Sequence, residues 1–220
     1  MHFLDRHASL AMTRILCYTT LMLYVFDEFD SLDSNFLMCC DTLLSQERKD
    51  KVQRLKSKQG KIQSAAAYLL LRYALCEEFG IDEAVNFEYN EYGKPLLQGY
   101  AHIHFNLSHC KSAVACVLSD SEVGVDVQEI RPVSDKLKKR VLTNEEWEMY
   151  CNIALQPEYF TKIWTIKEAY AKKSGQGISS DFSKINSNDI TDITVFQNKD
   201  YYCSVTKKDC SIKKGFLYER

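Results

Sequence analysis

The sequence lacks a large net charge, and it lacks repeats. Its 28 lysines and arginines nearly balance 30 aspartates and glutamates over 220 residues, which leaves −2 at pH 7. No overall field therefore draws the chain toward nucleic acid or a membrane surface. It contains no low-complexity stretch and no clear short repeat. With 45% hydrophobic residues, the composition is that of an ordinary globular protein of one domain or two small ones.

Paired cysteines and a membrane-spanning run are missing too. The nine cysteines are scattered without a Cys-x-x-Cys spacing, and adjacent Cys39 and Cys40 cannot easily bridge each other. We therefore expect reduced thiols and a cytoplasmic protein. The apolar stretch ILCYTTLMLYVF, residues 15–26, is too short to cross a bilayer as a helix, and no small-residue cleavage site follows it. Its β-branched and aromatic content predicts a buried strand.

Residues 45–81 indicate two helices in succession. The first is short and very basic, and we expect it to end near Gly60. The second is predicted from about Lys61 to Phe79, where Gly80 stops it. Its AAAYLLLRYAL segment is apolar nearly all round, which predicts that this helix is buried.

Strand-like segments and two further helical segments follow. Strands are predicted within residues 85–97 (before a Gly-Pro turn), 102–109, 112–119, 122–130 and 193–206, the last as a hairpin. Helices are predicted in residues 135–152 and 157–174. Thr143 and Glu146 have the spacing of a capping box, in which each side chain bonds the backbone of the other residue.

The order of these elements predicts an α+β protein. Strand, helices and strands occur twice along the chain, which favours two similar halves meeting near residue 120. We expect an N-terminal extension in residues 1–12, an N-terminal half in residues 13–120 and a C-terminal half in residues 121–220.

The segment WTIKEAYAKKSGQGI, residues 164–178, places charged residues on one face of a predicted helix. Trp164, Glu168, Lys172 and Gly175 fall at helical spacing, and Gly175 is expected to end the helix. By itself the pair Glu168 and Lys172 is adequately explained as a surface ion pair, worth a few tenths of a kcal/mol. Other segments are needed to favour a functional role.

Three more short segments stand out: GKP at residues 93–95, FNLSH at 105–109 and GVDVQ at 124–128. In this order, with WTIKEAYAK at 164–172, they resemble the 4′-phosphopantetheinyl transferases of the larger type that activates surfactin synthetase. The resemblance covers roughly residues 13–185. It implies two halves related by a pseudo-twofold, with coenzyme A between them, in a monomer. It also implies transfer of the phosphopantetheine arm of coenzyme A to a serine of an apo carrier protein, with release of 3′,5′-ADP.

The resemblance also assigns a metal site. Asp126 and Glu168 come from different elements, and two converging carboxylates repel unless a cation lies between them. Mg²⁺ is a hard ion that prefers such oxygen ligands, although Mn²⁺ remains an alternative. Gln128 stands where the family usually has a third carboxylate, so we expect weaker metal binding or a water in its place. Glu129 follows it, but on a strand it points to the opposite face.

Further residues match family positions that bind coenzyme A. By resemblance, Arg48 and Lys51 reach the 3′-phosphate, and Ser108 and His109 contact the other phosphates. Lys172 then stabilises the charge that develops during transfer. Taken alone, the first pair is equally explained as part of a solvated basic helix. The full set implied for coenzyme A is Arg48, Lys51, Lys94, Pro95, Ser108, His109 and Lys172, with Lys94 and Pro95 at the adenine end.

Catalysis and the partner leave alternatives open. The general base is Glu168 or a metal-held water. The basic run KLKKR, with Lys136, Lys138, Lys139 and Arg140, is either a solvated helix face or a dock for an acidic carrier helix. Carriers of fatty-acid, polyketide and peptide synthetases all remain open. The alternative functions are a non-catalytic binder of coenzyme A or carrier protein, and a Mg²⁺-dependent hydrolase of nucleotide pyrophosphates.

Overall fold

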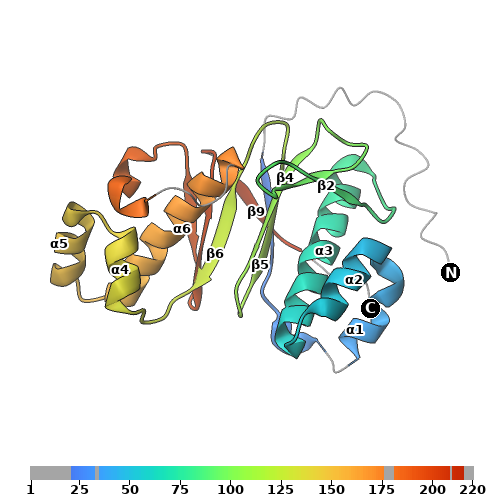
Figure 1. Ribbon diagram of the computed structural model, residues 1–220, viewed down its shortest axis with the longest axis horizontal. Helices are drawn as coiled ribbons and strands as arrows, with labels where there is room; N and C mark the ends of the chain where they lie inside the picture. The colour runs from blue at the N-terminus through green and yellow to red at the C-terminus, as the bar shows by residue number, and fades with distance from the viewer. Residues whose placement is uncertain (1–20, 33–34, 176–180, 209, 216–220) are drawn as a thin grey trace.

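The computed structural model describes residues 21–32, 35–175, 181–208 and 210–215. The predicted extension in residues 1–12 and the first part of the predicted strand in residues 15–26 lie outside these ranges. Three sheets and a set of helices make up the fold, which is mixed α+β as predicted (Figure 1).

The first sheet has the strand order β4-β5-β1-β9. Its strands are β1 (Met22–Phe26), β4 (His104–His109), β5 (Val114–Ser119) and β9 (Ser211–Lys214). β1 is antiparallel to β5 and parallel to β9, so the end of the described chain returns to its beginning. Helices α1 (Phe36–Cys39), α2 (Gln46–Arg54) and α3 (Lys58–Phe79) lie on one side of this sheet (Figure 1).

Helix α3 is the buried helix that the sequence predicts, with a different beginning. Ser57 caps it by accepting a hydrogen bond from the backbone N–H of Gly60 at 3.0 Å, so Gly60 lies in the first turn. The expected boundary near Gly60 was therefore wrong: α2 ends at Arg54, and this serine cap outweighs the glycine as a signal. The other end agrees, because Gly80 adopts the left-handed conformation (φ 69°) that stops a helix.

The second sheet has the order β6-β8-β7. The strands of this sheet are β6 (Val125–Glu129), β7 (Thr194–Gln197) and β8 (Tyr201–Val205). The third sheet is a hairpin of β2 (Phe87–Tyr89) and β3 (Pro95–Leu97). Helices α4 (Asp135–Val141), α5 (Asn144–Asn152) and α6 (Gln156–Ser174) lie on the far side of the second sheet (Figure 1). The capping box predicted at α5 is present. Short 3-10 turns are η1 (Phe29–Ser31), η2 (Asp41–Leu43), η3 (Phe182–Lys184) and η4 (Ser187–Asp189).

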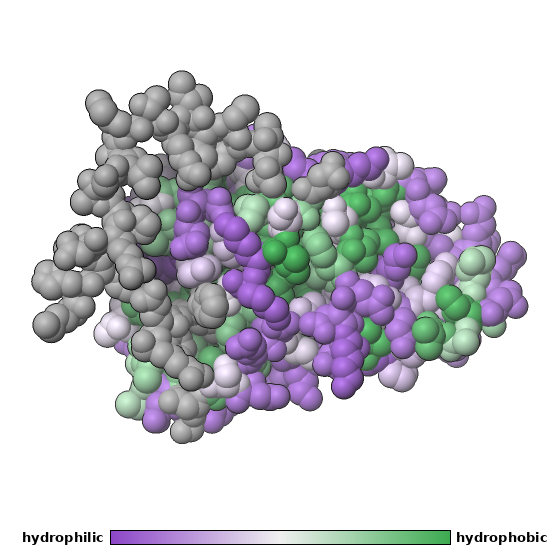
Figure 2. Space-filling view, turned by 180° about the vertical axis from the view of Figure 1, so that it is seen from behind, coloured by the Kyte–Doolittle hydropathy of each residue, from purple (hydrophilic) through white to green (hydrophobic). Residues whose placement is uncertain are grey.

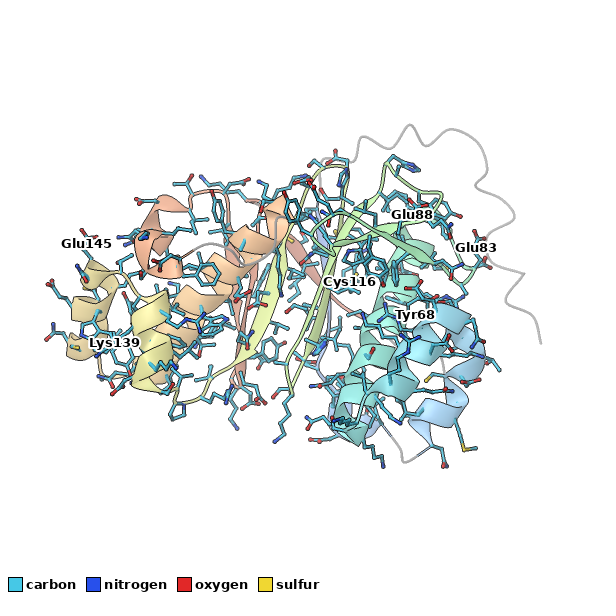
Figure 3. All side chains as sticks on the ribbon, viewed as in Figure 1. Tyr68, Glu83, Glu88, Cys116, Lys139 and Glu145 are labelled. Atoms are coloured by element: carbon cyan, nitrogen blue, oxygen red, sulfur yellow. The ribbon has the colours of Figure 1, made fainter. Side chains whose placement is uncertain are left out.

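Apolar side chains form three clusters. One fills the space between α3 and the first sheet, where Tyr68 and Cys116 lie (Figure 3). A second lies between the two larger sheets and includes Val125 and Val127, and a third joins α4, α5 and α6. Hydrophilic residues cover much of the face shown in Figure 2, with apolar residues between them. None of the described helices combines the length and apolar character that a membrane span requires.

Candidate active site

Two polar side chains of β4 join the first sheet to the second. Asn106 accepts a hydrogen bond from the backbone N–H of Val125 at 3.0 Å, and Ser108 accepts one from Val127 at 3.2 Å. β4 and β6 belong to different sheets, so side chains here replace the backbone pairing of a continuous sheet. This contact between β4 and β6, which we call the seam, explains why Asn106 and Ser108 are buried although they are polar.

Gly124 lets helix α6 approach β6 closely. A Cβ atom at this position would lie 2.0 Å from the carbonyl oxygen of Ala169 and 2.6 Å from the backbone nitrogen of Lys173. No side chain larger than hydrogen fits there. Asp126, two residues along the strand, is thereby brought to the face of α6 that carries Glu168 and Lys172.

The polar centre is built around the buried carboxylate of Asp126. Its Oδ1 accepts hydrogen bonds from the Ser108 hydroxyl at 2.8 Å and from the Lys172 ammonium at 2.6 Å. Its Oδ2 accepts a weaker one from the Gln128 amide at 3.3 Å. Glu168 is also buried, and this burial together with the charge of Asp126 raises its pKa to about 7, against the opposing effect of Lys172. The two carboxylates therefore lie close enough to repel each other.

This centre fits a divalent cation. Carboxylate oxygens and an amide oxygen are the hard ligands that Mg²⁺ prefers, and a bound cation would relieve the repulsion between Asp126 and Glu168. Among the described residues no three His, Cys, Asp or Glu side chains gather to hold a metal, and Gln128, whose amide lies 3.3 Å from Asp126, stands next to the two carboxylates. Glu129 does point to the opposite face, as predicted, and accepts a hydrogen bond from Ser112 at 2.7 Å.

Two cationic side chains of α2, those of Arg48 and Lys51, form no ion pair with a carboxylate of the described residues. The guanidinium of Arg48 is buried over the rings of Tyr68 and Phe87, 5.2 and 5.1 Å from their centroids. No carboxylate of the described residues forms an ion pair with it, and desolvation lowers its pKa. Desolvation and the charge of Arg48 also lower the pKa of Lys51. A buried cation without an ion-pair partner is stabilised when an anion binds to it, so Arg48 is a candidate anion-binding residue.

His109 is the last residue of β4 and follows Ser108. Desolvation lowers its pKa, and the positive charges of Lys172 and Lys51 lower it further, whereas Asp126 acts in the opposite direction. Lys51 belongs to α2 and Lys172 to α6, so charges from two different elements act on this imidazole. Hydrogen bonds join three of the predicted residues directly: Ser108 of β4, Asp126 of β6 and Lys172 of α6.

A comparison with known proteins gives the family. A model described as the 4′-phosphopantetheinyl transferase superfamily matches residues 122–212. The chain is 32% identical to the 4′-phosphopantetheinyl transferase gsp of Aneurinibacillus migulanus over 161 residues, which cover 72% of this chain and 66% of that protein. The chain belongs to the 4′-phosphopantetheinyl transferase superfamily.

Other transferases of this family match over a smaller share of their length. The chain is 27% identical to 4′-phosphopantetheinyl transferase Sfp of Bacillus subtilis (strain 168) over 141 residues, which are 63% of either chain. It is 41% identical to 4′-phosphopantetheinyl transferase AcpT of Salmonella typhimurium over 95 residues. The match thus spans less than two thirds of the Bacillus subtilis transferase.

The lysine next to Glu168 in the transferase motif has a structural place that the sequence did not indicate. Lys167 is fully buried, and its ammonium donates to the carbonyls of Val141 and Phe182 at 2.6 and 3.0 Å and to the Glu146 carboxylate at 2.5 Å. Glu146 also accepts the backbone N–H of Ser187 at 2.8 Å. The only signal in the sequence was the capping box, which predicts the position of Glu146 but not its partner.

Lys94, Pro95 and Lys172 line one pocket. The pocket lies between the β2–β3 turn and the end of α6, and Gly93, Asn106 and Gly175 also line it. The ammonium of Lys94 donates to the carbonyl of Lys173 at 2.8 Å. The side chain of Gln63 donates to the carbonyl of Cys110 at 2.6 Å.

Proposed function

We propose that this chain transfers the 4′-phosphopantetheine arm of coenzyme A to a serine of an apo carrier protein and releases 3′,5′-ADP. The observation that carries the proposal is the junction of Asp126, Glu168 and Lys172 at the seam, together with Arg48 and Lys51 of α2, which form no ion pair with a described residue. Carboxylates that can hold a divalent cation, together with cationic side chains that can bind phosphate groups, suit a pyrophosphate substrate such as coenzyme A. We also propose two similar halves, residues 13–120 and 121–220, related by a pseudo-twofold in a monomer.

Coenzyme A would lie across the seam. We assign its 3′-phosphate to Arg48 and Lys51, because a buried guanidinium without a carboxylate gains most from a phosphate. The pyrophosphate is assigned to Ser108, His109 and Lys172. Lys94 and Pro95 are assigned to the adenine end, where they line the neighbouring pocket.

Asp126, Glu168 and Gln128 would hold Mg²⁺. When bound, the ion supplies neutralisation of the pyrophosphate charge and activates the phosphorus toward attack. Gln128 contributes a carbonyl oxygen without charge, so the site has one negative charge fewer than a site with three carboxylates. For the same reason we expect the metal to bind more weakly here.

The reaction itself is a displacement at phosphorus. The carrier serine oxygen forms a bond to the phosphorus that bears the pantetheine arm, while the bond from that phosphorus to the bridging oxygen of 3′,5′-ADP breaks. Glu168, or a water it orients, takes the serine proton. Lys172, which contacts Asp126 in the free protein, stabilises the charge of the leaving group.

The carrier protein would dock on helix α4. The basic residues of α4 lie at the end of the molecule opposite α1 to α3, as the position of Lys139 shows (Figure 3). Lys136, Lys139 and Arg140 are exposed, whereas Lys138 pairs with Asp135 and lies over the ring of Tyr150.

A small pit lies next to this surface. It is lined by Gln128, Val133, Leu137, Phe160 and Trp164, and also by Glu129, Arg131 and Thr161. The indole N–H of Trp164 has no partner among the described residues. We propose that the pit receives an apolar residue of the carrier helix, next to the serine.

The direct test is the intact mass of an apo carrier protein after incubation with this protein, coenzyme A and Mg²⁺. A gain equal to one phosphopantetheine arm, lost on chelation and with the Glu168→Gln variant, is expected. Loss of coenzyme A without any carrier would indicate a pyrophosphate hydrolase instead. Coenzyme A binding without transfer to carriers of all three synthetase classes would indicate a non-catalytic binder.

The docking surface has a separate test. Reversing Lys136 and Lys139 to Glu should lower kcat/KM for the carrier about tenfold at low salt and much less at high salt. Binding of coenzyme A should not change. The variant with Lys199 and Lys208 reversed to Glu has the same change in net charge on the β7–β8 side, and we expect normal kinetics from it. Equal effects of both variants would refute the dock on α4.

A further inference from the structure

Helix α6 ends in an unusual way. Helix α3 closes on its own backbone, because the N–H of Gly80 donates to the carbonyls of Cys76 and Leu75. Gly175 takes the same left-handed conformation (φ 64°) at the end of α6, but within the described part of the chain its N–H makes no such capping bond. Two carbonyls at the end of α6, those of Lys173 and Gly175, instead accept hydrogen bonds from donors outside the helix.

Those donors come from the turn between β2 and β3, on the other side of the seam. Lys94 donates from its ammonium to the carbonyl of Lys173 at 2.8 Å. Asn90 donates from its amide nitrogen to the carbonyl of Gly175 at 3.2 Å. We call these two side chains, with the two carbonyls that accept from them, the clasp.

Asn90 also shapes the turn that presents Lys94. Its Oδ1 accepts the backbone N–H of Tyr92 at 3.0 Å and of Lys94 at 2.8 Å. The oxygen of the amide thus holds the turn, and the nitrogen holds the helix. This division matters for testing, because an aspartate at this position keeps the acceptor and loses the donor.

The contact between turn and helix end is tight and electrostatically favourable. A Cβ atom on Gly175 would lie 2.6 Å from the Cδ of Lys94 and 3.2 Å from the Asn90 amide nitrogen. An ammonium beside the last carbonyls also compensates the negative end of the helix dipole. Lys94 and Asn90 are both partly buried, so solvent competes weakly for these bonds.

We infer that the clasp positions Lys172, and that Asn90 is a positioning residue for the transfer reaction. Lys172 lies in the last turn of α6, three residues before Gly175, and its ammonium must reach Asp126 and Ser108 at 2.6 and 3.0 Å. A last turn without its caps frays, which would move this lysine and then Glu168, one turn earlier. The kinetic part of this inference rests on the proposed function; the structural part does not.

The structural part is tested by hydrogen exchange in the free protein. In Asn90→Asp the amides of the last turn of α6 should exchange at least about tenfold faster than in the unchanged protein, because the turn keeps its acceptor but the helix loses a donor. Amides at the end of α3 should be unaffected. Lys173→Met is the matched control: it removes a charge at the same place but keeps the carbonyl that Lys94 contacts. Unchanged exchange at α6 in Asn90→Asp would overturn the clasp.

The functional part is tested by steady-state kinetics with carrier and coenzyme A. Asn90→Asp should lower kcat about tenfold or more, since small displacements of a catalytic group are costly, while KM for coenzyme A stays within about twofold. In a Lys172→Met background the same change should have almost no further effect on kcat. Full additivity of the two changes, or an effect on KM alone, would overturn the inference. Absence of transfer by the unchanged protein would instead refute the proposed function, and the exchange result would still decide the clasp.

Discussion

Replacing Lys167 with methionine should destabilise the protein more than any other single change of a lysine in the described structure. The side chain is fully buried, and its ammonium joins three parts of the chain: the end of α4, the start of α5 and the segment of η3. Methionine is close in length, so it fills most of the space. What it removes is the positive charge and three hydrogen bonds.

The size of the effect follows from what is left behind. Removing one partner of a buried ion pair typically costs about 3–5 kcal/mol, because the other charge stays buried without compensation. Glu146 keeps two backbone donors, from Thr143 and Ser187, each at 2.8 Å, which limits the loss. The carbonyls of Val141 and Phe182 lose a donor each. We therefore expect a loss of about 3–4 kcal/mol, or roughly 6–16 °C in Tm for a chain of this length.

Urea unfolding at pH 7 measures the loss, with Lys173→Met as the control. Lys173 lies six residues further along the same helix and forms an exposed pair with Asp192 at 3.5 Å, for which we expect a change below about 1 kcal/mol. A loss for Lys167→Met as small as that of the control would refute the reasoning. So would a large loss that persists unchanged when Glu146→Gln is added, because the penalty should come from that carboxylate.

The same pair predicts a pH dependence. Burial alone would raise the pKa of Glu146, but hydrogen bonds from Lys167, Ser187 and Thr143 outweigh it and lower the pKa below 4.5. A carboxylate whose pKa is lower in the folded protein stabilises the fold at pH values above its pKa in the unfolded chain. This stabilisation is lost as the pH falls through the pKa of the carboxylate in the folded protein. The difference between the unchanged protein and Lys167→Met should therefore be largest at neutral pH and shrink below about pH 4.5.

Four further predictions follow from the site. A pKa raised from 4.5 to about 7 means that ionised Glu168 opposes folding, so Glu168→Gln should stabilise the metal-free protein by up to about 3 kcal/mol in urea at pH 8 and not at pH 4; an equal gain at both pH values would contradict it. Arg48→Met should weaken coenzyme A binding about tenfold or more in calorimetry, with little effect on dephospho-coenzyme A, which lacks the 3′-phosphate. Gly124→Ala should cost at least about 3 kcal/mol, because its Cβ would overlap the carbonyl of Ala169; a normal Tm would exclude the close approach. Gln128→Glu should tighten Mn²⁺ binding about tenfold by electron paramagnetic resonance, and no change would show that this side chain does not face the metal.

Local patterns in the sequence were enough to predict most helices and strands. The strand of GVDVQ, the capping box at α5, the hairpin of β7 and β8 and the end of α6 at Gly175 all agree with the structure. Each depends on neighbours along the chain, such as a glycine at a left-handed position or alternation between two faces. The convergence of Asp126 with Glu168 and Lys172 was predicted as well, but by family resemblance, because local patterns carry no information about which elements meet.

What could not be predicted depends on contacts between distant residues. Periodicity gives no sign that Asn106 and Ser108 bond the backbone of another strand, or that Lys94 caps a helix some 80 residues later. Lys167 and Glu168 are adjacent in the motif and look equivalent there. Successive residues of a helix point about 100° apart, so one lies in the core with Glu146 and the other at the seam.

The return of β9 to the first sheet has a consequence for synthesis of the protein. β9 pairs with β1, and Lys213 reaches Tyr24 across 189 residues of chain. During translation, the outer edge of β1 therefore stays without a partner until nearly all the described elements have left the ribosome. Contacts of such long range form late and slowly, and an open strand edge can pair with other chains in the meantime. A nascent chain halted after residue 205 should accordingly depend on a chaperone to remain unaggregated, whereas the chain released after β9 should not.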